Sequence, residues 1–260
     1  MVDLQRRYWN NLAKSYQAST SIALNDFHYG PLVPGERQLN LLPELTPGDR
    51  VLELGCGGAQ NSVWLAGRGM DCTAIDISSE QLRQARAIAR RAGVKITFKR
   101  VPMETFHLRV ATKFHLIHSS HAFEFVDDPA AIIRRAAVRL LPGGALLIST
   151  VHPLYNGEWV ESLDEHGRPD GMGLLLRNYF QPPDDARFKN GRLEVISRAY
   201  PVASWFDWMR AAGLEVIRLV EPPALPRDTP PPYNSAGWDE AHEQLRAVPG
   251  TLIVAARRPG

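Results

Sequence analysis

One stretch, Arg50-Val51-Leu52-Glu53-Leu54-Gly55-Cys56-Gly57-Gly58-Ala59-Gln60, constrains the fold of this chain more than any other. An apolar run typical of a buried strand leads into glycines, and residues 62–66 then have the pattern of a helix start. Gly55 and Gly57 can take backbone angles that other residues resist, which lets a ligand approach the main chain. Backbone N–H groups beside the positive end of a helix attract anionic or polar groups. The stretch therefore predicts a strand–turn–helix corner that binds a nucleotide-like ligand.

Strands and helices continue to alternate from this corner to residue 150. The pattern predicts strands at Arg50–Leu54, Cys72–Asp76, Lys95–Lys99, Phe114–Ser119 and Ala145–Thr150. Between them, Ser78 and Gln81 form a capping-box pattern, and Asp128-Pro129 is typical of a helix start. Such βαβ units form a parallel sheet, whose ligands bind outside the carboxyl ends of its strands. Gly55, Asp76 and Ser119 fall at such ends, which predicts a site there.

The composition excludes several classes of protein. Hydrophobic residues make up 44% of the chain and charged residues 22%, a globular balance that argues against disorder. A formal net charge of +2 gives no support for a nucleic-acid or membrane partner. The two cysteines, Cys56 and Cys72, suggest neither a disulfide framework nor a metal site. No apolar run approaches ~18 residues, so we expect a cytoplasmic protein and leave homo-oligomerisation open.

The residues of the corner discriminate between two classes of ligand. A dinucleotide fingerprint requires Gly-x-Gly-x-x-Gly, but Gln60 stands where the third glycine should be. Glu53 would also repel a pyrophosphate, because like charges repel each other. A ligand that carries an ammonium or sulfonium group and no phosphate escapes this repulsion. The corner therefore favours a cationic nucleoside over a nicotinamide dinucleotide.

Three successive motifs carry a resemblance to a known family. Glu53-Leu54-Gly55-Cys56-Gly57-Gly58, Ala74-Ile75-Asp76-Ile77-Ser78 and Phe114–Pro129 resemble motifs of class I S-adenosylmethionine-dependent methyltransferases. Within that superfamily the chain is similar to the small-molecule branch, with its ubiquinone-type and natural-product enzymes. The similarity covers residues 40–150 and, more loosely, the terminal strand pair. It implies an α/β fold with a doubly wound, mostly parallel, seven-stranded Rossmann-like sheet, an antiparallel last strand, an N-terminal helical cap and an insertion after strand five.

The resemblance also implies a set of residues around S-adenosylmethionine or its product S-adenosylhomocysteine. Asp76 would bind the ribose hydroxyls, Ile77 would pack on adenine, and Glu53 would act near the amino group. The remaining implied cofactor-binding residues are Tyr16, Gly55, Cys56, Gly57, Gln81, Met103, Glu104 and Ser119. Two positions depart from the family pattern. Pro102 stands where relatives often have an acidic residue for the adenine amino group, and Phe125 stands where many have histidine.

We expect one domain over residues 1–260 in four consecutive parts: a helical cap (1–48), a cofactor-binding core (49–150), a lid or acceptor insertion (151–203), and a terminal helix with strands (204–260). The insertion interrupts the alternation with prolines, glycines and aromatic residues, which is typical of a binding loop. The cap contains a helix at 3–17. The last part contains helices at 204–212 and 240–247 and strands at 214–220 and 251–257.

Methyl transfer requires the acceptor atom, the methyl carbon and the sulfur to be collinear in a dry pocket. His121 and His152 are the best-placed candidates for a catalytic base, because they follow central strands. Candidate residues for binding a small-molecule acceptor are Tyr8, Phe123, Tyr155, Trp159 and Tyr179. The sequence contains no metal-ligand pattern. Together with the resemblance it predicts an N- or O-methyltransferase that acts on a small molecule, and only the resemblance favours a secondary metabolite. The alternatives are a non-catalytic S-adenosylmethionine-binding protein and a nicotinamide-dependent oxidoreductase.

Overall fold

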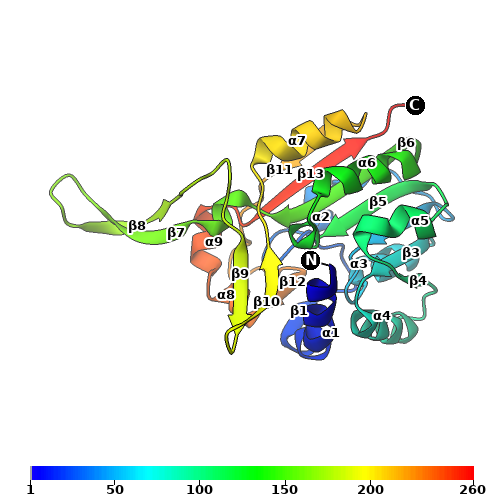
Figure 1. Ribbon diagram of the computed structural model, residues 1–260, viewed down its shortest axis with the longest axis horizontal. Coiled ribbons are helices and arrows are strands. Elements are labelled where there is room, and N and C mark those ends of the chain that lie inside the picture. The colour runs from blue at the N-terminus through cyan, green and yellow to red at the C-terminus, as the bar shows by residue number, and fades with distance from the viewer. Residues whose placement is uncertain (1) are drawn as a thin grey trace.

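A seven-stranded sheet forms the centre of the computed structural model, which describes residues 2–260 (Figure 1). The strands lie in the order β11-β13-β6-β5-β2-β3-β4. Their bounds are β2 (Arg50–Leu54), β3 (Asp71–Asp76), β4 (Thr97–Arg100), β5 (Phe114–Ser120), β6 (Leu140–Val151), β11 (Glu215–Val220) and β13 (Thr251–Arg257). Strand β13 pairs antiparallel with β6 and β11, whereas the pairings among β2 to β6 are parallel. The expected fold class is confirmed.

Helices and short strands surround this sheet. The helices are α1 (Val2–Ser19), α2 (Glu36–Leu39), α3 (Gln60–Ala66), α4 (Ser79–Arg91), α5 (Phe106–Arg109), α6 (Pro129–Arg139), α7 (Val202–Ala211), α8 (Ala236–Asp239) and α9 (His242–Ala247). Single 3-10 turns are η1 (Met103–Thr105), η2 (Phe123–Phe125) and η3 (Pro153–Asn156). Outside the main sheet lie β1 (Thr20–Ile22), β7 (Glu158–Leu163), β8 (Pro169–Leu175), β9 (Asp185–Lys189), β10 (Arg192–Ser197) and β12 (Tyr233–Ser235). Within the described residues, no helix is both long enough and apolar enough for a membrane crossing.

Alternation along the strands fills a separate core on each face of the sheet. Leu52 and Leu54 of β2 point to one face, where they join a buried cluster that includes Trp205 of α7. Val51 points to the opposite face and joins a second cluster that includes Trp64 of α3. Successive side chains of a strand point to opposite faces, and a parallel sheet is covered on both. This double burial explains why the strands appear as continuous apolar runs in the sequence.

Two helices begin after polar residues whose side chains cap the helix. The Ser78 hydroxyl accepts a hydrogen bond from the Gln81 N–H at 3.1 Å, at the start of α4. At the start of α6, Asp128 Oδ1 accepts a hydrogen bond from the Ala131 N–H at 2.9 Å. Each contact satisfies one of the N–H groups that a helix start leaves unpaired. Both predicted helix starts are confirmed.

Strand β6 begins at Leu140, five residues before the predicted strand at 145–150. The pairing with β5 skips from Leu140 to Ala145, so the intervening residues form a bulge. There Gly143 has a φ of +77°, and its N–H donates to the Arg258 carbonyl at 2.9 Å. These glycines therefore stay within the sheet by pairing with the chain that follows β13.

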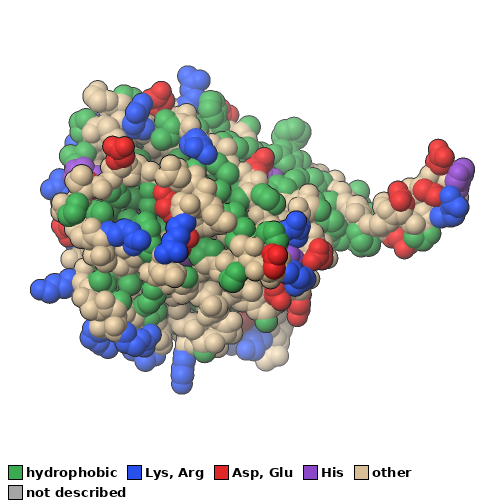
Figure 2. Space-filling view, turned by 180° about the vertical axis from the view of Figure 1, so that it is seen from behind, with side chains coloured by type: hydrophobic (Ala, Val, Ile, Leu, Met, Phe, Trp, Pro, Cys, Tyr) green, Lys and Arg blue, Asp and Glu red, His purple; other side chains and the backbone are tan. Residues whose placement is uncertain are grey.

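The insertion predicted at 151–203 forms two hairpins that lie in different places. Hairpin β7–β8 extends away from the body of the molecule (Figure 1). Figure 2 shows acidic, basic and histidine side chains gathered at its tip. Hairpin β9–β10 instead packs against α1, where Gln5 Nε2 donates to the Ile196 carbonyl at 2.7 Å. Only the second hairpin is in contact with the helix that covers the carboxyl edge of the sheet.

Candidate active site

A pocket lies at the carboxyl ends of β2, β3, β4 and β5, beneath α1. This is the edge at which parallel α/β sheets bind ligands. Its wall contains most residues that the sequence predicted for the cofactor, together with one of the two predicted catalytic histidines. They are Tyr16, Glu53, Gly55, Cys56, Gly57, Asp76, Ile77, Gln81, Met103, Glu104 and His121. The sheet therefore gathers residues that lie more than 100 positions apart in the sequence.

At the glycine corner, main-chain atoms without side chains form part of the pocket wall. Gly55 and Gly57 have φ angles of +68° and +51°. A Cβ atom at Gly55 would lie 2.5 Å from the Ala122 Cβ, which is too close for any side chain. Both the backbone angle and this contact require glycine at position 55. The strand-to-helix turn after β2 is thus fixed by residue type, as the sequence predicted.

Asp76 ends β3 and fastens the glycine corner. One carboxylate oxygen accepts a hydrogen bond from the Gly57 N–H at 2.9 Å, and the other accepts from the Ser78 N–H at 2.8 Å. Burial raises the pKa of this carboxyl group to about 6, against the opposing effect of these backbone donors. Asp76 therefore holds the corner in place and still lines the pocket.

Glu53 is a second buried carboxyl group at the same corner. Its Oε2 accepts hydrogen bonds from the hydroxyl and the backbone N–H of Ser62, the latter at 3.2 Å. Burial raises the pKa of Glu53 to about 8, although both Ser62 donors act in the opposite direction. Asp76, whose carboxyl group is ionised above about pH 6, gives the pocket wall a negative charge that suits a ligand with positive charge and hydroxyl groups and disfavours a phosphate. Glu53 stays neutral below about pH 8.

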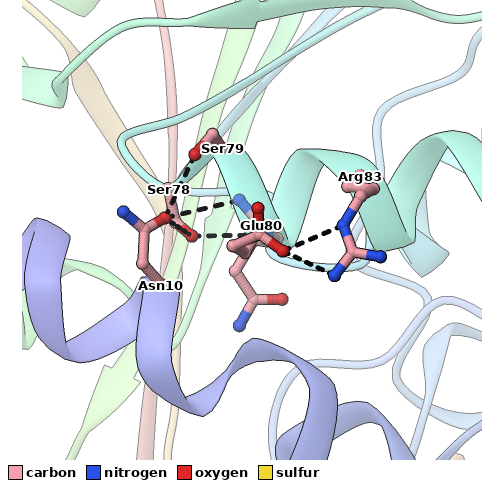
Figure 3. A network of polar contacts seen from close by, with 6 residues as sticks. Asn10, Ser78, Ser79, Glu80 and Arg83 are labelled. Atoms are coloured by element: carbon pink, nitrogen blue, oxygen red, sulfur yellow. Dashed lines mark hydrogen bonds and ion pairs between the residues drawn. The ribbon is translucent and has the colours of Figure 1, made fainter.

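Helix α1 is fastened over the pocket by amide side chains. Asn10 Oδ1 accepts hydrogen bonds from the Ser78 and Ser79 hydroxyls at 2.8 and 3.4 Å and from the Glu80 N–H at 3.3 Å (Figure 3). Two turns further along α1, Gln17 Oε1 accepts from Gln60 Nε2 at 2.9 Å. Asn10 thus joins α1 to the start of α4, directly after the Asp76 strand.

Histidine and tyrosine side chains form a second group in the pocket wall. The hydroxyls of Tyr16 on α1 and Tyr233 on β12 are hydrogen-bonded to each other. The His28 ring packs edge-to-face on Tyr233, with ring centroids 5.3 Å apart. Ser120 Oγ lies 3.3 Å from the His28 carbonyl oxygen, to which it donates, and His121 follows in the chain. We name Tyr16, His28, Ser120, His121 and Tyr233 the histidine–tyrosine end of the pocket.

His121 occupies an unusual backbone conformation, with a φ of +49° in the left-handed region. Its Nε2 lies 3.2 Å from Thr251 Oγ1, and its Nδ1 lies 3.4 Å from Glu124 Oε1. Strained residues of this kind cluster at functional sites. The ring is held on both sides, by β13 and by the turn after β5.

His152, the other predicted catalytic residue, does not line the pocket. Its Nε2 lies 2.7 Å from Glu221 Oε1, and its Nδ1 accepts a hydrogen bond from the Leu154 N–H at 3.1 Å. The imidazole caps η3, and both ring nitrogens are engaged. We therefore remove His152 from the candidate site.

Ser119 and four of the five predicted acceptor-binding residues also lie in structural contacts outside the pocket wall. Ser119 donates to the Leu54 carbonyl at 2.8 Å, so its neighbour Ser120 takes the pocket position. Phe123 is fully buried against Trp205. The other three contacts are Tyr155 on Trp238, Trp159 paired with Leu174 in the projecting hairpin, and the Tyr179 hydroxyl accepting from the Val202 N–H.

Tyr8, the fifth of them, packs edge-to-face on Trp9, and it is Trp9 that lines the pocket. The two residues are neighbours on α1, and the aromatic side chains that this helix contributes to the pocket wall are those of Trp9 and Tyr16. Sequence reasoning did not select Gln17, His28 and Tyr233 for the wall. His28 and Tyr233 lie in segments without a periodic pattern, so their contact could not be predicted from the sequence. Among residues 2–260, no group of three acidic, histidine or cysteine side chains could hold a metal ion.

A family model described as a methyltransferase domain matches residues 28–219, and this range includes the glycine corner, Asp76 and His121. The chain belongs to this methyltransferase family. Its cofactor is S-adenosylmethionine. The pocket fits such a group, because Asp76 and Glu53 offer oxygen acceptors and the bare corner at Gly55 leaves room for it.

Individual relatives agree with the family. The ubiquinone biosynthesis O-methyltransferase of Bordetella avium is 34% identical over 105 residues, which cover 40% of this chain and 44% of the relative. The match thus spans less than half of that relative. An S-adenosylmethionine-dependent methyltransferase structure from Mesorhizobium loti is 25% identical, covers 84% of this chain and 94% of its own, and has a TM-score of 0.65. The [4+2]-cyclase SpnF shares the fold with a TM-score of 0.55, 20% identity and coverage of 83% and 77%.

Proposed function

We propose that this protein transfers a methyl group from S-adenosylmethionine to an oxygen or nitrogen atom of a small molecule, with a secondary metabolite as the favoured acceptor. The observation that carries the proposal is a single pocket whose wall contains two chemically different groups. Asp76 and the glycine corner form one group, and His28, His121 and the tyrosine pair form the other. In this proposal the two groups form the two ends of the pocket, and a methyl donor at the first end would face an acceptor at the second.

The cofactor end supplies contacts suited to each part of the nucleoside. In this proposal the Asp76 carboxylate accepts hydrogen bonds from the ribose hydroxyls, and Ile77 and Met103 pack against adenine. Glu53 acts near the amino group through the turn that Ser62 holds. Glu104, whose pKa burial raises, lines the pocket beside Met103 and replaces the acidic residue that Pro102 displaces. Gln81 completes this part of the wall, whereas Tyr16, which the sequence also predicted for the cofactor, belongs to the histidine–tyrosine end.

When bound, S-adenosylmethionine supplies an electrophilic methyl group attached to a sulfonium. The protein's residues hold the acceptor in line with it and exclude water. Trp9 and Phe125 pack edge-to-face with ring centroids 5.2 Å apart and close the pocket from the α1 side. His121 is the catalytic candidate at the opposite end, where Glu124 and Thr251 fix its ring. Both ring nitrogens of His121 have partners, so to accept the proton that an acceptor hydroxyl releases, the ring must give up its contact with Thr251.

Parallel calorimetric titrations with S-adenosylmethionine, S-adenosylhomocysteine and NAD test the cofactor part of the proposal. We expect the first two to bind and NAD not to bind. Turnover is tested by following S-adenosylhomocysteine formation with a panel of phenolic and amine acceptors. Binding without turnover on any acceptor would favour the non-catalytic alternative, and binding of NAD alone would refute the proposal. His121→Ala should lose turnover and keep its affinity for S-adenosylhomocysteine.

A further inference from the structure

We infer that His28 is an acceptor-binding residue, whose ring nitrogen accepts a hydrogen bond from a hydroxyl group of the methyl acceptor. The inference rests on the proposed function and deepens it, because it selects hydroxylated molecules as the acceptor class. Three observations support it. The imidazole of His28 lines the pocket, hydrogen bonds hold the backbone of His28, and the imidazole has hydrogen-bonding capacity that the protein does not use.

Asn61 and Ser120 clamp the backbone of His28. Asn61 Oδ1 accepts a hydrogen bond from the His28 N–H at 2.9 Å, and Asn61 Nδ2 donates to the His28 carbonyl at 2.9 Å. Ser120 Oγ donates to the same carbonyl at 3.3 Å. Asn61 is fully buried on α3, directly behind the glycine corner. These bonds fix the backbone of His28, and packing on Tyr233 orients its ring before a ligand arrives, as a preorganised binding site requires.

The imidazole of His28 has hydrogen-bonding capacity that the protein does not use. His28 is 8% exposed, and its Nδ1 is buried without a hydrogen-bond partner among the described residues. Nδ1 is closed off from the pocket, whereas Nε2 is not buried in this way and also has no hydrogen-bond partner among the described residues. Nε2 is therefore the ring nitrogen that a ligand in the pocket can reach. Burial also lowers the pKa of His28 to about 3, which keeps the ring neutral beside a cationic methyl donor.

The other polar groups of the histidine–tyrosine end are already engaged. The Tyr16 and Tyr233 hydroxyls bond to each other, and the two ring nitrogens of His121 face Thr251 and Glu124. Ser120 bonds to Asn61 and to the His28 carbonyl. His28 is therefore the member of this group with a ring nitrogen that has no partner among the described residues. We assign it a hydroxyl group of the acceptor other than the one that is methylated.

The test compares phenol with anisole, its methyl ether, as probes in the protein loaded with S-adenosylhomocysteine. Both are titrated while the ring signals of 13C-labelled histidines are followed by NMR. We expect phenol to bind about tenfold more tightly than anisole, because one hydrogen bond contributes about this factor to an affinity. In His28→Phe the two probes should bind alike. His118→Phe is the matched control, because His118 is an equally buried histidine outside the pocket wall and should keep the preference.

Cofactor binding separates failure of this inference from failure of the proposed function. Every variant is first titrated with S-adenosylhomocysteine, which also reports whether it has folded. A wild-type protein that binds S-adenosylhomocysteine but shows no preference for phenol would overturn the inference, as would a His28→Phe variant that keeps it. Loss of S-adenosylhomocysteine binding in His28→Phe alone would assign His28 to the cofactor instead. No cofactor binding in the wild type would refute the proposed function itself.

Discussion

Asp76 holds the glycine corner and faces the pocket, so at the scale of single residues it offers the sharpest test of the cofactor end. Asp76→Asn removes the charge that strengthens hydrogen bonds to ribose hydroxyls and weakens the hold on Gly57. We expect affinity for S-adenosylhomocysteine to fall by about 10- to 100-fold, measured by calorimetry. Asp71→Asn, at the exposed opposite end of β3, is the control and should bind normally. Unchanged affinity in Asp76→Asn would remove this residue from the site.

Gly55 tests whether the close approach of the main chain matters beyond its backbone angle. Gly55→Ala introduces a left-handed alanine and a Cβ atom 2.5 Å from the Ala122 Cβ. Gly93→Ala is the matched control, because Gly93 also has a positive φ but nothing within 4 Å of an added Cβ. Both should lose about 1 kcal/mol of stability from the backbone angle. Only Gly55→Ala should lose cofactor affinity as well, by at least about tenfold.

A second substitution in Gly55→Ala tests whether the collision with Ala122 causes the loss of cofactor affinity. Ala122→Gly removes the atom with which the new Cβ collides, and it should restore part of the affinity in a calorimetric titration. Equal cofactor affinity in Gly55→Ala and Gly93→Ala would contradict the argument from close approach. It would leave only the backbone angle as the reason for glycine at this position.

The raised pKa of Glu53 leads us to expect that the stability of the ligand-free protein depends on pH. Its pKa is raised from 4.5 to about 8 in the folded state, so its favourable contribution is complete below pH 4.5 and is lost as the pH rises toward 8. His28 and His118, whose pKa values are lowered from 6.5 to about 3, change their contributions only below pH 6.5. Asp76, raised to about 6, has completed most of its titration by then.

Between pH 6.5 and 8 the free energy of unfolding should therefore fall because of Glu53. We expect a decrease of about 1–2 kcal/mol across this interval, measured by urea denaturation. Glu53→Gln keeps an oxygen for the Ser62 donors and does not titrate, so the decrease should be absent in that variant. The same decrease in Glu53→Gln would assign it to another group.

At the scale of whole elements, α1 shows what periodicity can and cannot predict. The apolar spacing over 3–17 predicts a helix, and the structure has α1 at Val2–Ser19. Strand β13 likewise has the predicted bounds, Thr251–Arg257, because a buried strand requires an uninterrupted apolar run. The seat of α1 on α4 could not be predicted in this way. It depends on the amides of Asn10 and Gln17, polar residues that resemble any solvated position in the sequence.

Asn10 therefore provides a test at this scale. Asn10→Ala removes the acceptor that joins α1 to the Ser78 and Ser79 hydroxyls and to the start of α4 (Figure 3). We expect faster amide hydrogen exchange along α1 and an affinity for S-adenosylhomocysteine lower by about threefold to tenfold. Asn11→Ala changes the same residue type at the next, exposed position and should match the wild type in both measurements. Wild-type exchange in Asn10→Ala would show that other contacts hold α1.

At the scale of the whole molecule, the sequence specified the core and the cofactor end more fully than the acceptor end. The strand–turn–helix corner and Asp76 are local patterns, so their positions follow from a parallel sheet. His28 and Tyr233 meet through long irregular segments, which carry no periodicity to predict the contact. The aromatic residues of the insertion were misassigned for the same reason. Composition indicated a binding loop, but only the tertiary fold determines which way a hairpin points.

The projecting hairpin β7–β8 gives the last prediction, because it decides whether the insertion acts as a lid. Trp159 to Leu174 can be replaced by two glycines, since Glu158 and Leu175 are paired neighbours at the base of the hairpin. None of the removed residues lines the pocket, so affinity for S-adenosylhomocysteine should stay within about twofold of the wild type. Gln5→Ala provides the contrast, because it breaks the contact of α1 with the other hairpin at Ile196 and should weaken binding by about threefold. If calorimetry instead shows a large loss of affinity on removing β7–β8, the hairpin must fold over the pocket when the cofactor binds.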